Sequence, residues 1–150
     1  MIDLARDQKK PVLIDPKGSD YLRYKGATMI TPNRAELREV VGAWRDETEL
    51  TAKTQQLREN LRLQSVLLTR SEEGLSLFGK DSVVHHPTTA REVYDVSGAG
   101  DTVIATMALS IAAGLPETQA MKIANAAAGV VVGKVGTAVC SFDELMRVLV

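Results

Sequence analysis

The apolar positions of the chain form short β-branched runs that alternate with longer stripes at helical spacing. Three short runs bounded by turn-forming residues predict buried strands at residues 11–15, 27–31 and 65–70. Two further runs, at residues 74–79 and 82–86, have the spacing of a hairpin. The chain is therefore expected to form a sheet whose last two strands are joined as a hairpin.

Apolar residues at helical spacing lie between these strand-like runs and in the segment after the last run, and they predict helices there. The helix after Pro32 is expected to end at Gly42, because glycine is the usual helix stop. A longer helix at residues 46–63 has an apolar stripe of leucines, and Ser141 and Glu144 have the spacing of a capping box. Other helices are predicted at residues 101–113, 116–133 and 141–150, and residues 2–10 are typical of the tail of an amphipathic helix. The residues expected in the helical core are Leu50, Leu57, Leu61, Met107, Met121 and Met146.

Strands that alternate with helices through short loops predict the α/β class, with a mainly parallel sheet covered by helices. Ligands of such sheets collect at the carboxyl ends of the strands. The polar or glycine-rich loops after Asp15, after Thr69 and around Gly98 all follow predicted strands. No repeat or interdomain linker is evident, so we expect one domain over residues 1–150.

Composition narrows the classes of partner. With 45% apolar and 25% charged residues the chain is of the ordinary globular type, and its net charge of −1 provides no general attraction to nucleic acid or to a membrane. Any anion site must therefore be local. The single cysteine and the absence of a signal-like or membrane-spanning run lead us to expect a soluble, cytoplasmic protein.

The stretch "DVSGAGDT", residues 95–102, is the strongest local signal for chemistry. Gly98, Ala99 and Gly100 leave room for an anion beside the unpaired N–H groups of a helix start. A carboxylate at Asp101 would repel a phosphate unless it had another task, such as taking the proton of an attacking alcohol. The alternative is a purely structural role, in which Asp101 caps the helix and the glycines make a turn. The residues alone leave both alternatives open.

The same stretch resembles the C-terminal signature D-T-x-G-A-G-D of the ribokinase-like, phosphofructokinase B-type carbohydrate kinases, with Val96 where threonine is common. "TPNRAE" is similar to the family's N-x-x-E element, and "NAAAGVVVGKVGT" looks like its helix and turn beside the nucleotide. The resemblance covers nearly the whole chain. It implies a ribokinase-like three-layer α/β/α sandwich, of which the chain would be the C-terminal, nucleotide-binding half.

Within this family, "LIDPKG", "MITPNRAEL" and "LLTRSEEG" are most similar to heptose 7-phosphate kinases. The resemblance implies ATP-dependent phosphorylation of D-glycero-β-D-manno-heptose 7-phosphate at its anomeric hydroxyl, a step toward ADP-heptose and lipopolysaccharide. Another sugar of the same family is the alternative. The resemblance also implies that the sugar-binding half, and the adenylyltransferase domain of bifunctional members, lie outside these residues.

The resemblance assigns Asp101 as the catalytic base and Gly98, Ala99 and Gly100 as the anion hole. Glu36 would hold Mg²⁺ through a water, although Asn33 and Glu36 also have the spacing of a capping box. Some family members use a monovalent cation at this turn, so K⁺ near Ser97 and Gly136 is a candidate. The residues expected to bind ATP or its phosphates are Lys17, Asn33, Glu36, Thr69, Arg70, Ser71, Gly74, Asp95, Ser97, Gly98, Gly100 and Asn125.

Each of these assignments has a structural alternative. Lys17 could be a solvated lysine in a turn, and residues 69–74 a plain connection between strands. Asn125 precedes three alanines that suit either an adenine ring or close helix packing. Two functions remain: an ATP-dependent sugar kinase, or a nucleotide-binding or assembly module without turnover of its own. Because a sheet cut at its edge exposes strand and apolar surface, we also expect a homo-oligomer.

Overall fold

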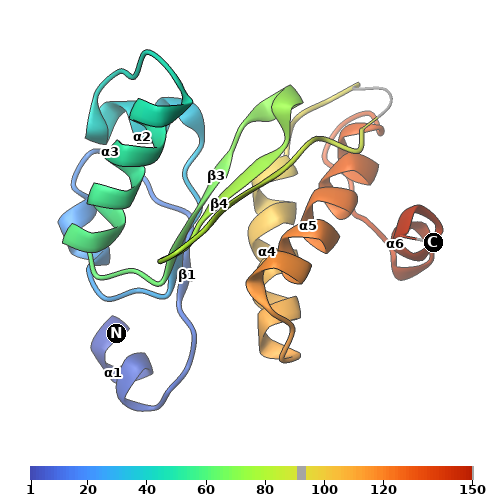
Figure 1. Cartoon of the computed structure of the whole chain (residues 1–150). Helices are drawn as coiled ribbons and strands as arrows, with labels where there is room; N and C mark the ends of the chain where they lie inside the picture. Colours follow the sequence, from blue (N-terminus) through green and yellow to red (C-terminus); the bar gives the residue numbers. More distant parts are fainter. Residues whose placement is uncertain (91–93, 150) are drawn as a thin grey trace. The chain divides into compact units, whose positions relative to one another are not determined.

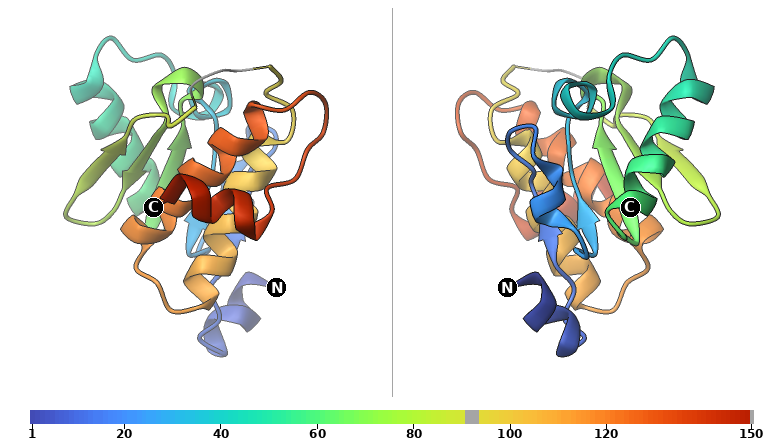
Figure 2. Two further views of the ribbon diagram at one scale, coloured as in Figure 1. Left: turned by 90° about the vertical axis from the view of Figure 1, so that its right-hand side faces the viewer. Right: turned by 90° about the vertical axis from the view of Figure 1, so that its left-hand side faces the viewer.

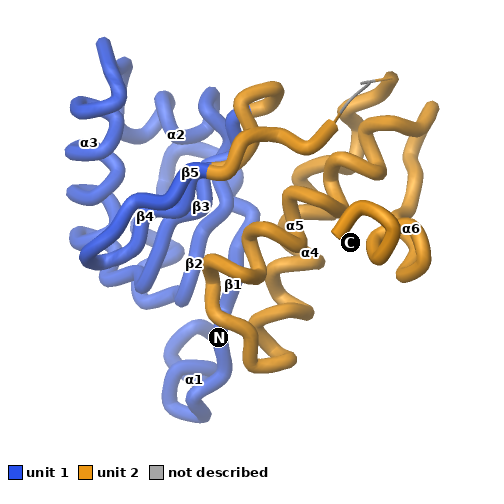
Figure 3. Tube along the Cα trace, turned by 45° about the vertical axis from the view of Figure 1, so that its right-hand side comes forward, with its two compact units in different colours: residues 1–70, 76–85 blue, residues 71–75, 86–150 orange. Residues whose placement is uncertain are grey.

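A computed structural model describes residues 1–90 and 94–149. The chain forms two compact units, which Figure 3 shows in different colours. Unit 1 consists of residues 1–70 and 76–85, and unit 2 of residues 71–75 and 86–150.

The five predicted strands are all present and form one sheet in the order β1-β2-β3-β4-β5. The first three are parallel, with Ile14 opposite Ile30 and Ile30 opposite Val66. The connections before β4 and β5 are too short for a parallel crossover, so these two strands run antiparallel to their neighbours. The strand bounds are β1 Leu13–Ile14, β2 Met29–Ile30, β3 Ser65–Thr69, β4 Leu75–Phe78 and β5 Val83–His86.

Helices α2 (Arg34–Val41) and α3 (Glu47–Asn60) pack on β3 in unit 1 (Figure 1). Leu50, Leu57 and Leu61 are buried there, as predicted, at 0%, 8% and 1% exposure. Helix α2 ends at the predicted glycine, whereas α3 ends before residue 63 because Arg62 has a left-handed φ of 54°. Two short elements complete this part of the unit, namely α1 Ile2–Asp7 and the unpredicted 3₁₀ turn η1 Tyr21–Tyr24.

Unit 2 contains the 3₁₀ turn η2 (Ser71–Glu73) and the helices α4 (Ala99–Ala112) and α5 (Glu117–Val132). The two helices lie side by side (Figures 1 and 2), with Met107 and Met121 fully buried. Helix α4 begins at Ala99, two residues before the predicted start, and its N-cap is Gly98 in a left-handed conformation that glycine adopts readily.

The final helix, α6 (Phe142–Leu149), packs on α5 and begins at the predicted capping box. The hydroxyl of Ser141 accepts the Glu144 N–H at 3.3 Å, and the Lys134 ammonium lies 2.7 Å from the Glu144 carboxylate. The Lys134 bond is the largest cause that lowers the pKa of Glu144 to about 2. The prediction for Met146 is wrong: it is 42% exposed, because α6 buries none of its residues fully. Val150, the predicted end of this helix, lies outside the described residues.

Across residues 1–90 and 94–149, no helix combines the length and the hydropathy that crossing a membrane requires.

Candidate active site

The carboxyl ends of the three parallel strands bring together two of the three predicted loops, those after Asp15 and after Thr69, with the segment at Asn33. The third predicted loop, around Gly98, belongs to unit 2. Asp15 and Lys17 follow β1, Asn33 follows β2, and Thr69 ends β3. Asn33 forms a parallel bridge with Thr69, whose N–H donates to the Pro32 carbonyl at 3.0 Å. This edge of the sheet in unit 1 is therefore polar, as expected for a ligand-binding edge of an α/β fold.

Asn33 and Glu36 form the capping box at the start of α2. The Asn33 side chain accepts the Glu36 N–H at 2.9 Å, and Glu36 Oε2 accepts the Asn33 N–H at 2.8 Å. The capping alternative is thus realised. It leaves Glu36 Oε1 for a second partner, so capping and a further role are compatible.

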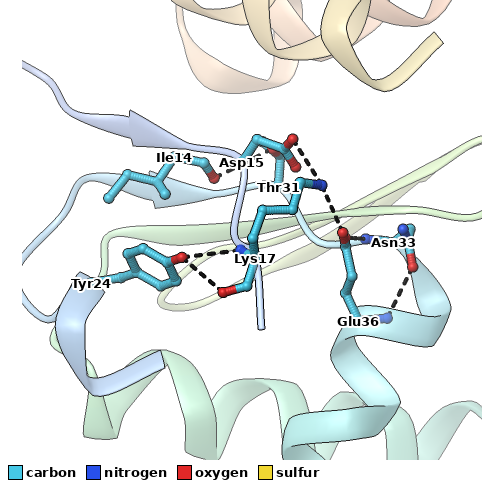
Figure 4. Close-up of polar contacts among 7 residues, drawn as sticks. All are labelled: Ile14, Asp15, Lys17, Tyr24, Thr31, Asn33 and Glu36. Carbon is cyan, nitrogen blue, oxygen red and sulfur yellow. Dashed lines mark hydrogen bonds and ion pairs between the residues drawn. The ribbon is translucent and has the colours of Figure 1, made fainter. Parts of the chain in front are cut away.

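That second partner is Lys17, whose ammonium lies 2.8 Å from Glu36 Oε1 and 3.0 Å from Asp15 (Figure 4). Hydrogen bonds to Glu36 and then to Asp15 raise the pKa of Lys17 above its ordinary value. The Glu36 side chain is only 18% exposed, whereas the Lys17 side chain is 68% exposed. The ammonium is therefore fixed between two carboxylates and still open to an anion.

Arg70, in contrast, is occupied by a structural ion pair. It is 6% exposed, and its two terminal nitrogens lie 2.9 Å and 2.5 Å from the two oxygens of Glu47, at the first turn of α3. One of them also donates to Ser76 Oγ at 3.2 Å. A bidentate pair of this kind orients the guanidinium strongly. The nucleotide-binding role of Arg70 stays a prediction.

Ser71 and Gly74 make the tight turn η2 in unit 2. The Ser71 carbonyl accepts the Gly74 N–H at 3.1 Å, and Gly74 has a φ of 91°. A Cβ at Gly74 would lie 2.1 Å from the His86 carbonyl oxygen. The close approach of two backbone segments therefore requires a glycine at position 74, which agrees with the alternative of a plain turn between strands. The contact of Gly74 with ATP stays a prediction.

The glycine loop presents free N–H groups at the start of α4. Gly98, at φ 78°, is the N-cap, and no side chain caps the helix. Thr102 closes the first turn, since its N–H and its hydroxyl donate to the Gly98 carbonyl at 2.9 Å and 2.8 Å. Within the described residues, the N–H groups of Gly100 and Asp101 have no protein acceptor. Such donors at a helix N-terminus are suited to an anion.

Asp101 is exposed in the first turn of α4, and its carboxylate makes no hydrogen bond or ion pair with any residue that the structure describes. It does not cap the helix, so the capping alternative does not apply to it. A carboxylate without a protein partner beside free N–H groups is available to a substrate hydroxyl.

Asp95 orders the loop that leads to these groups. Its Oδ1 accepts the Ser97 N–H at 2.8 Å, and the N–H groups of Tyr94 and Asp95 donate to the Val132 carbonyl at 2.8 Å and 3.3 Å. The Ser97 N–H is the largest cause that lowers the pKa of Asp95, followed by the Ser97 hydroxyl, while the Gly136 N–H contributes less. The loop is thus tied to the C-terminal end of α5.

This arrangement predicts how the loop responds to acid. Because the folded-state pKa of Asp95 is lowered, the carboxylate stabilises the loop fully above the ordinary aspartate pKa of about 3.9, and the stabilisation is lost as the pH falls through the folded-state pKa. Amide NMR shifts of Ser97 and Gly136 should therefore be constant from pH 7 to about pH 5 and should titrate together below about pH 3.9. A midpoint above that value would contradict the assignment.

Gly100 differs from Gly74 because the protein leaves space around it: nothing lies within 4 Å of an added Cβ. We expect Gly100→Val to weaken ATP binding by about tenfold or more, since the branched side chain would fill the approach to the free N–H groups. The midpoint of thermal unfolding should change little. Gly100→Ala should give a smaller loss of affinity. Unchanged ATP affinity in a folded Gly100→Val variant would place the phosphate elsewhere.

Asn125 is 4% exposed in α5, and its Nδ2 donates to the Pro87 carbonyl at 2.7 Å. The Thr89 hydroxyl donates back to the Asn125 carbonyl at 3.3 Å, and a Cβ at Gly129 would lie 2.7 Å from Thr89 Oγ1. The structure therefore realises the close-packing alternative here. The adenine contact of Asn125 stays a prediction.

Sequence reasoning missed Tyr24 at this site. Its hydroxyl accepts the Lys17 N–H at 3.0 Å and donates to the Lys17 carbonyl at 3.1 Å (Figure 4). No motif marks an aromatic residue seven positions after a lysine. The available signal was a pair of tyrosines in an otherwise polar loop.

Solved structures with the same fold show the fold class of this chain. Ribokinase of Arabidopsis thaliana, solved with ribose and ATP, matches 99% of this chain with a TM-score of 0.88 at 21% identity, and the match covers 50% of the ribokinase. Phosphofructokinase-2 of Escherichia coli, solved with potassium, matches 98% with a TM-score of 0.86 at 19% identity and is covered to 49%. The fold is therefore ribokinase-like, which confirms the predicted fold class.

The chain belongs to the pfkB family of carbohydrate kinases, whose family model matches residues 1–144. The D-beta-D-heptose 7-phosphate kinase of Bordetella bronchiseptica is 56% identical over 145 residues, which are 97% of this chain and 46% of that protein. The bifunctional protein HldE of Photorhabdus laumondii is 56% identical over 146 residues, which are 97% of this chain and 31% of that protein. The chain thus spans less than half the length of these two relatives.

Proposed function

We propose that this chain carries the ATP-binding and phosphoryl-transfer part of a kinase that phosphorylates D-glycero-β-D-manno-heptose 7-phosphate at its anomeric hydroxyl. The observation that carries the proposal is the start of α4, where the carboxylate of Asp101 and the free N–H groups of Gly100 and Asp101 occur together. The 56% identity to a protein named D-beta-D-heptose 7-phosphate kinase supports the choice of sugar. The product would be the 1,7-bisphosphate, a precursor of ADP-heptose and lipopolysaccharide.

In the proposed reaction Asp101 takes the proton of the anomeric hydroxyl as that oxygen attacks the γ-phosphorus of ATP. The new oxygen–phosphorus bond forms, the bond to the bridging β–γ oxygen breaks, and ADP leaves with the electron pair. Within the predicted anion hole of Gly98, Ala99 and Gly100, the Ala99 N–H already donates to the Val96 carbonyl at 3.2 Å. The free N–H groups of Gly100 and Asp101 would therefore stabilise the charge on the transferring group. Protonation of Asp101 would remove its function as a base, so its ionised form is the active one.

Lys17 would contact a phosphate oxygen as a point charge, because its ammonium is held in place yet exposed. Mg²⁺ usually binds through few carboxylates, waters and substrate phosphates, and both oxygens of Glu36 already accept hydrogen bonds, from the Asn33 N–H and from the Lys17 ammonium. A bound Mg²⁺ would neutralise phosphate charge, and Glu36 would hold it through a water. K⁺ near Ser97 and Gly136 is proposed by analogy with the phosphofructokinase-2 solved with potassium.

The partners of the whole protein are part of the same proposal. ATP and a sugar phosphate are the expected ligands. An adenylyltransferase domain in the parent protein is proposed from the family resemblance, and the name of the relative from Photorhabdus laumondii, bifunctional protein HldE, supports a second activity. A homo-oligomer remains the expectation for this chain. Neither nucleic acid nor a membrane is an expected partner, given the net charge of −1.

Calorimetry with ATP, run beside an ADP-release assay with heptose 7-phosphate, tests the proposal on the intact protein and on this chain. We expect saturable, sugar-dependent ADP release by the intact protein. ATP binding by the 150-residue chain without turnover would favour the nucleotide-binding module for the chain alone. Absence of both ATP binding and turnover in the intact protein would refute the proposed function.

A further inference from the structure

The turn after β1 is held by one tyrosine hydroxyl. Tyr24 accepts the Lys17 N–H at 3.0 Å and donates to the Lys17 carbonyl at 3.1 Å (Figure 4). Because both backbone groups of one residue bind the same oxygen, the peptide planes on either side of Lys17 are fixed. The direction in which the Lys17 side chain leaves the backbone is fixed with them.

The ring of Tyr24 is anchored in the hydrophobic core of unit 1. It is 8% exposed and belongs to the same buried cluster as Ile30 and Leu37. Its centroid lies 5.6 Å from that of Tyr21 in an edge-to-face arrangement, and the Arg23 guanidinium lies 5.3 Å from it. A buried tyrosine with its hydroxyl at the core boundary is a rigid connection between the core and a surface loop.

The opposite end of Lys17 is held as firmly. Its ammonium lies 2.8 Å from Glu36 and 3.0 Å from Asp15, so the backbone and the charge of one flexible residue are both constrained. A lysine side chain has many rotamers, and fixing it in advance lowers the entropy lost when an anion binds. Gly18, which follows Lys17, has a left-handed φ of 73°.

We propose that Tyr24 is a positioning residue: its hydroxyl fixes the Lys17 backbone so that the ammonium is held between Asp15 and Glu36, ready for a phosphate. This inference rests on the proposed contact between Lys17 and phosphate. Tyr24 itself touches no ligand and acts through Lys17. Its effect on ATP binding should therefore disappear when Lys17 has lost its charge.

The experiment is a double-mutant cycle on ATP affinity in the intact protein, with Tyr24→Phe, Lys17→Met and the double variant. Tyr24→Phe removes one oxygen and should weaken ATP binding about two- to tenfold, and Lys17→Met should weaken it about tenfold or more. In the Lys17→Met background, Tyr24→Phe should change the affinity less than about twofold, because residues that act through one contact are not additive.

Tyr21→Phe is the matched control. Tyr21 lies on the same 3₁₀ turn and is 2% exposed, but among the described residues its hydroxyl has no hydrogen-bond partner. The same loss of one oxygen should leave ATP affinity unchanged there. Hydrogen exchange of the Lys17 N–H supplies a readout without ligand: its protection should fall in Tyr24→Phe and persist in Tyr21→Phe.

Three results would overturn the proposal: a Lys17 N–H still protected in Tyr24→Phe, equal weakening by Tyr24→Phe with and without the lysine, or unchanged ATP affinity in Tyr24→Phe while Lys17→Met binds weakly. A different result would separate it from the proposed function. If Lys17→Met bound ATP normally while Tyr24→Phe exposed the Lys17 N–H to exchange, the hydroxyl contact would stand and the phosphate contact of Lys17 would be refuted.

Discussion

Asp101→Asn should lower the turnover of the intact protein by about 10² to 10⁴, the usual contribution of a general base. Asparagine keeps the size and hydrogen-bonding geometry of the side chain, but its amide cannot take the proton of the sugar hydroxyl. ATP affinity should stay within a few-fold, because the free N–H groups at the start of α4 remain. Turnover number and KM for heptose 7-phosphate, measured with saturating ATP, separate the lost step from lost binding.

Asp143→Asn provides the matched control for this substitution. Asp143 also lies exposed in the first turn of a helix, α6, and it makes no hydrogen bond or ion pair within the described residues. Removing its charge changes the helix terminus in the same way without touching the glycine loop. We expect normal turnover. Near-normal turnover of Asp101→Asn would eliminate Asp101 as the base, and an equal loss in Asp143→Asn would indicate a general effect of charge.

The strands could be predicted from sequence because their β-branched runs end at turn-forming residues. The parallel order of β1 and β2 explains why the loop after Asp15 lies close to the segment at Asn33, since the carboxyl ends of parallel strands share one edge of the sheet. The end of α3 could not be predicted in the same way. Leu61 and Leu63 continue the apolar pattern, but both are buried beyond the helix, in a turn that Arg62 makes with a left-handed φ of 54°.

Side-chain positions in the candidate site could be predicted where they depend on residues close in sequence. They could not be predicted where they depend on contacts between residues far apart in sequence. The capping box of Asn33 and Glu36 needs only a spacing of three residues. Arg70, by contrast, pairs with Glu47, which lies 23 residues earlier and on another element. Nothing in the sequence near Arg70 indicates that partner. Tyr24 was missed for the same reason, because its hydroxyl meets the backbone of Lys17 only after the sheet has formed.

Gly74→Ala should destabilise the folded chain by about 2–5 kcal/mol. A left-handed φ costs an alanine about 1–2 kcal/mol, and forcing atoms into a packed region costs about 1–3 kcal/mol more. Both apply because Gly74 has a φ of 91° and its added Cβ would lie 2.1 Å from the His86 carbonyl oxygen and 2.6 Å from Pro87. These are backbone atoms, so no side-chain rotation relieves the overlap. The midpoint of thermal unfolding should fall by about 4–20 °C.

Gly79→Ala is the control for this loss, since its added Cβ would meet nothing closer than 3.6 Å and its backbone is not left-handed. It should shift the midpoint of thermal unfolding far less than Gly74→Ala.

ATP affinity, measured at a temperature where both variants are folded, then tests the function of Gly74 separately from its packing. Equal affinities of the two variants would mean that Gly74 is required by the crossing of two backbone segments. A further loss of ATP affinity confined to Gly74→Ala would instead support the contact with ATP that the family resemblance implies. An unfolding midpoint for Gly74→Ala as high as that of the unaltered chain would refute the steric argument.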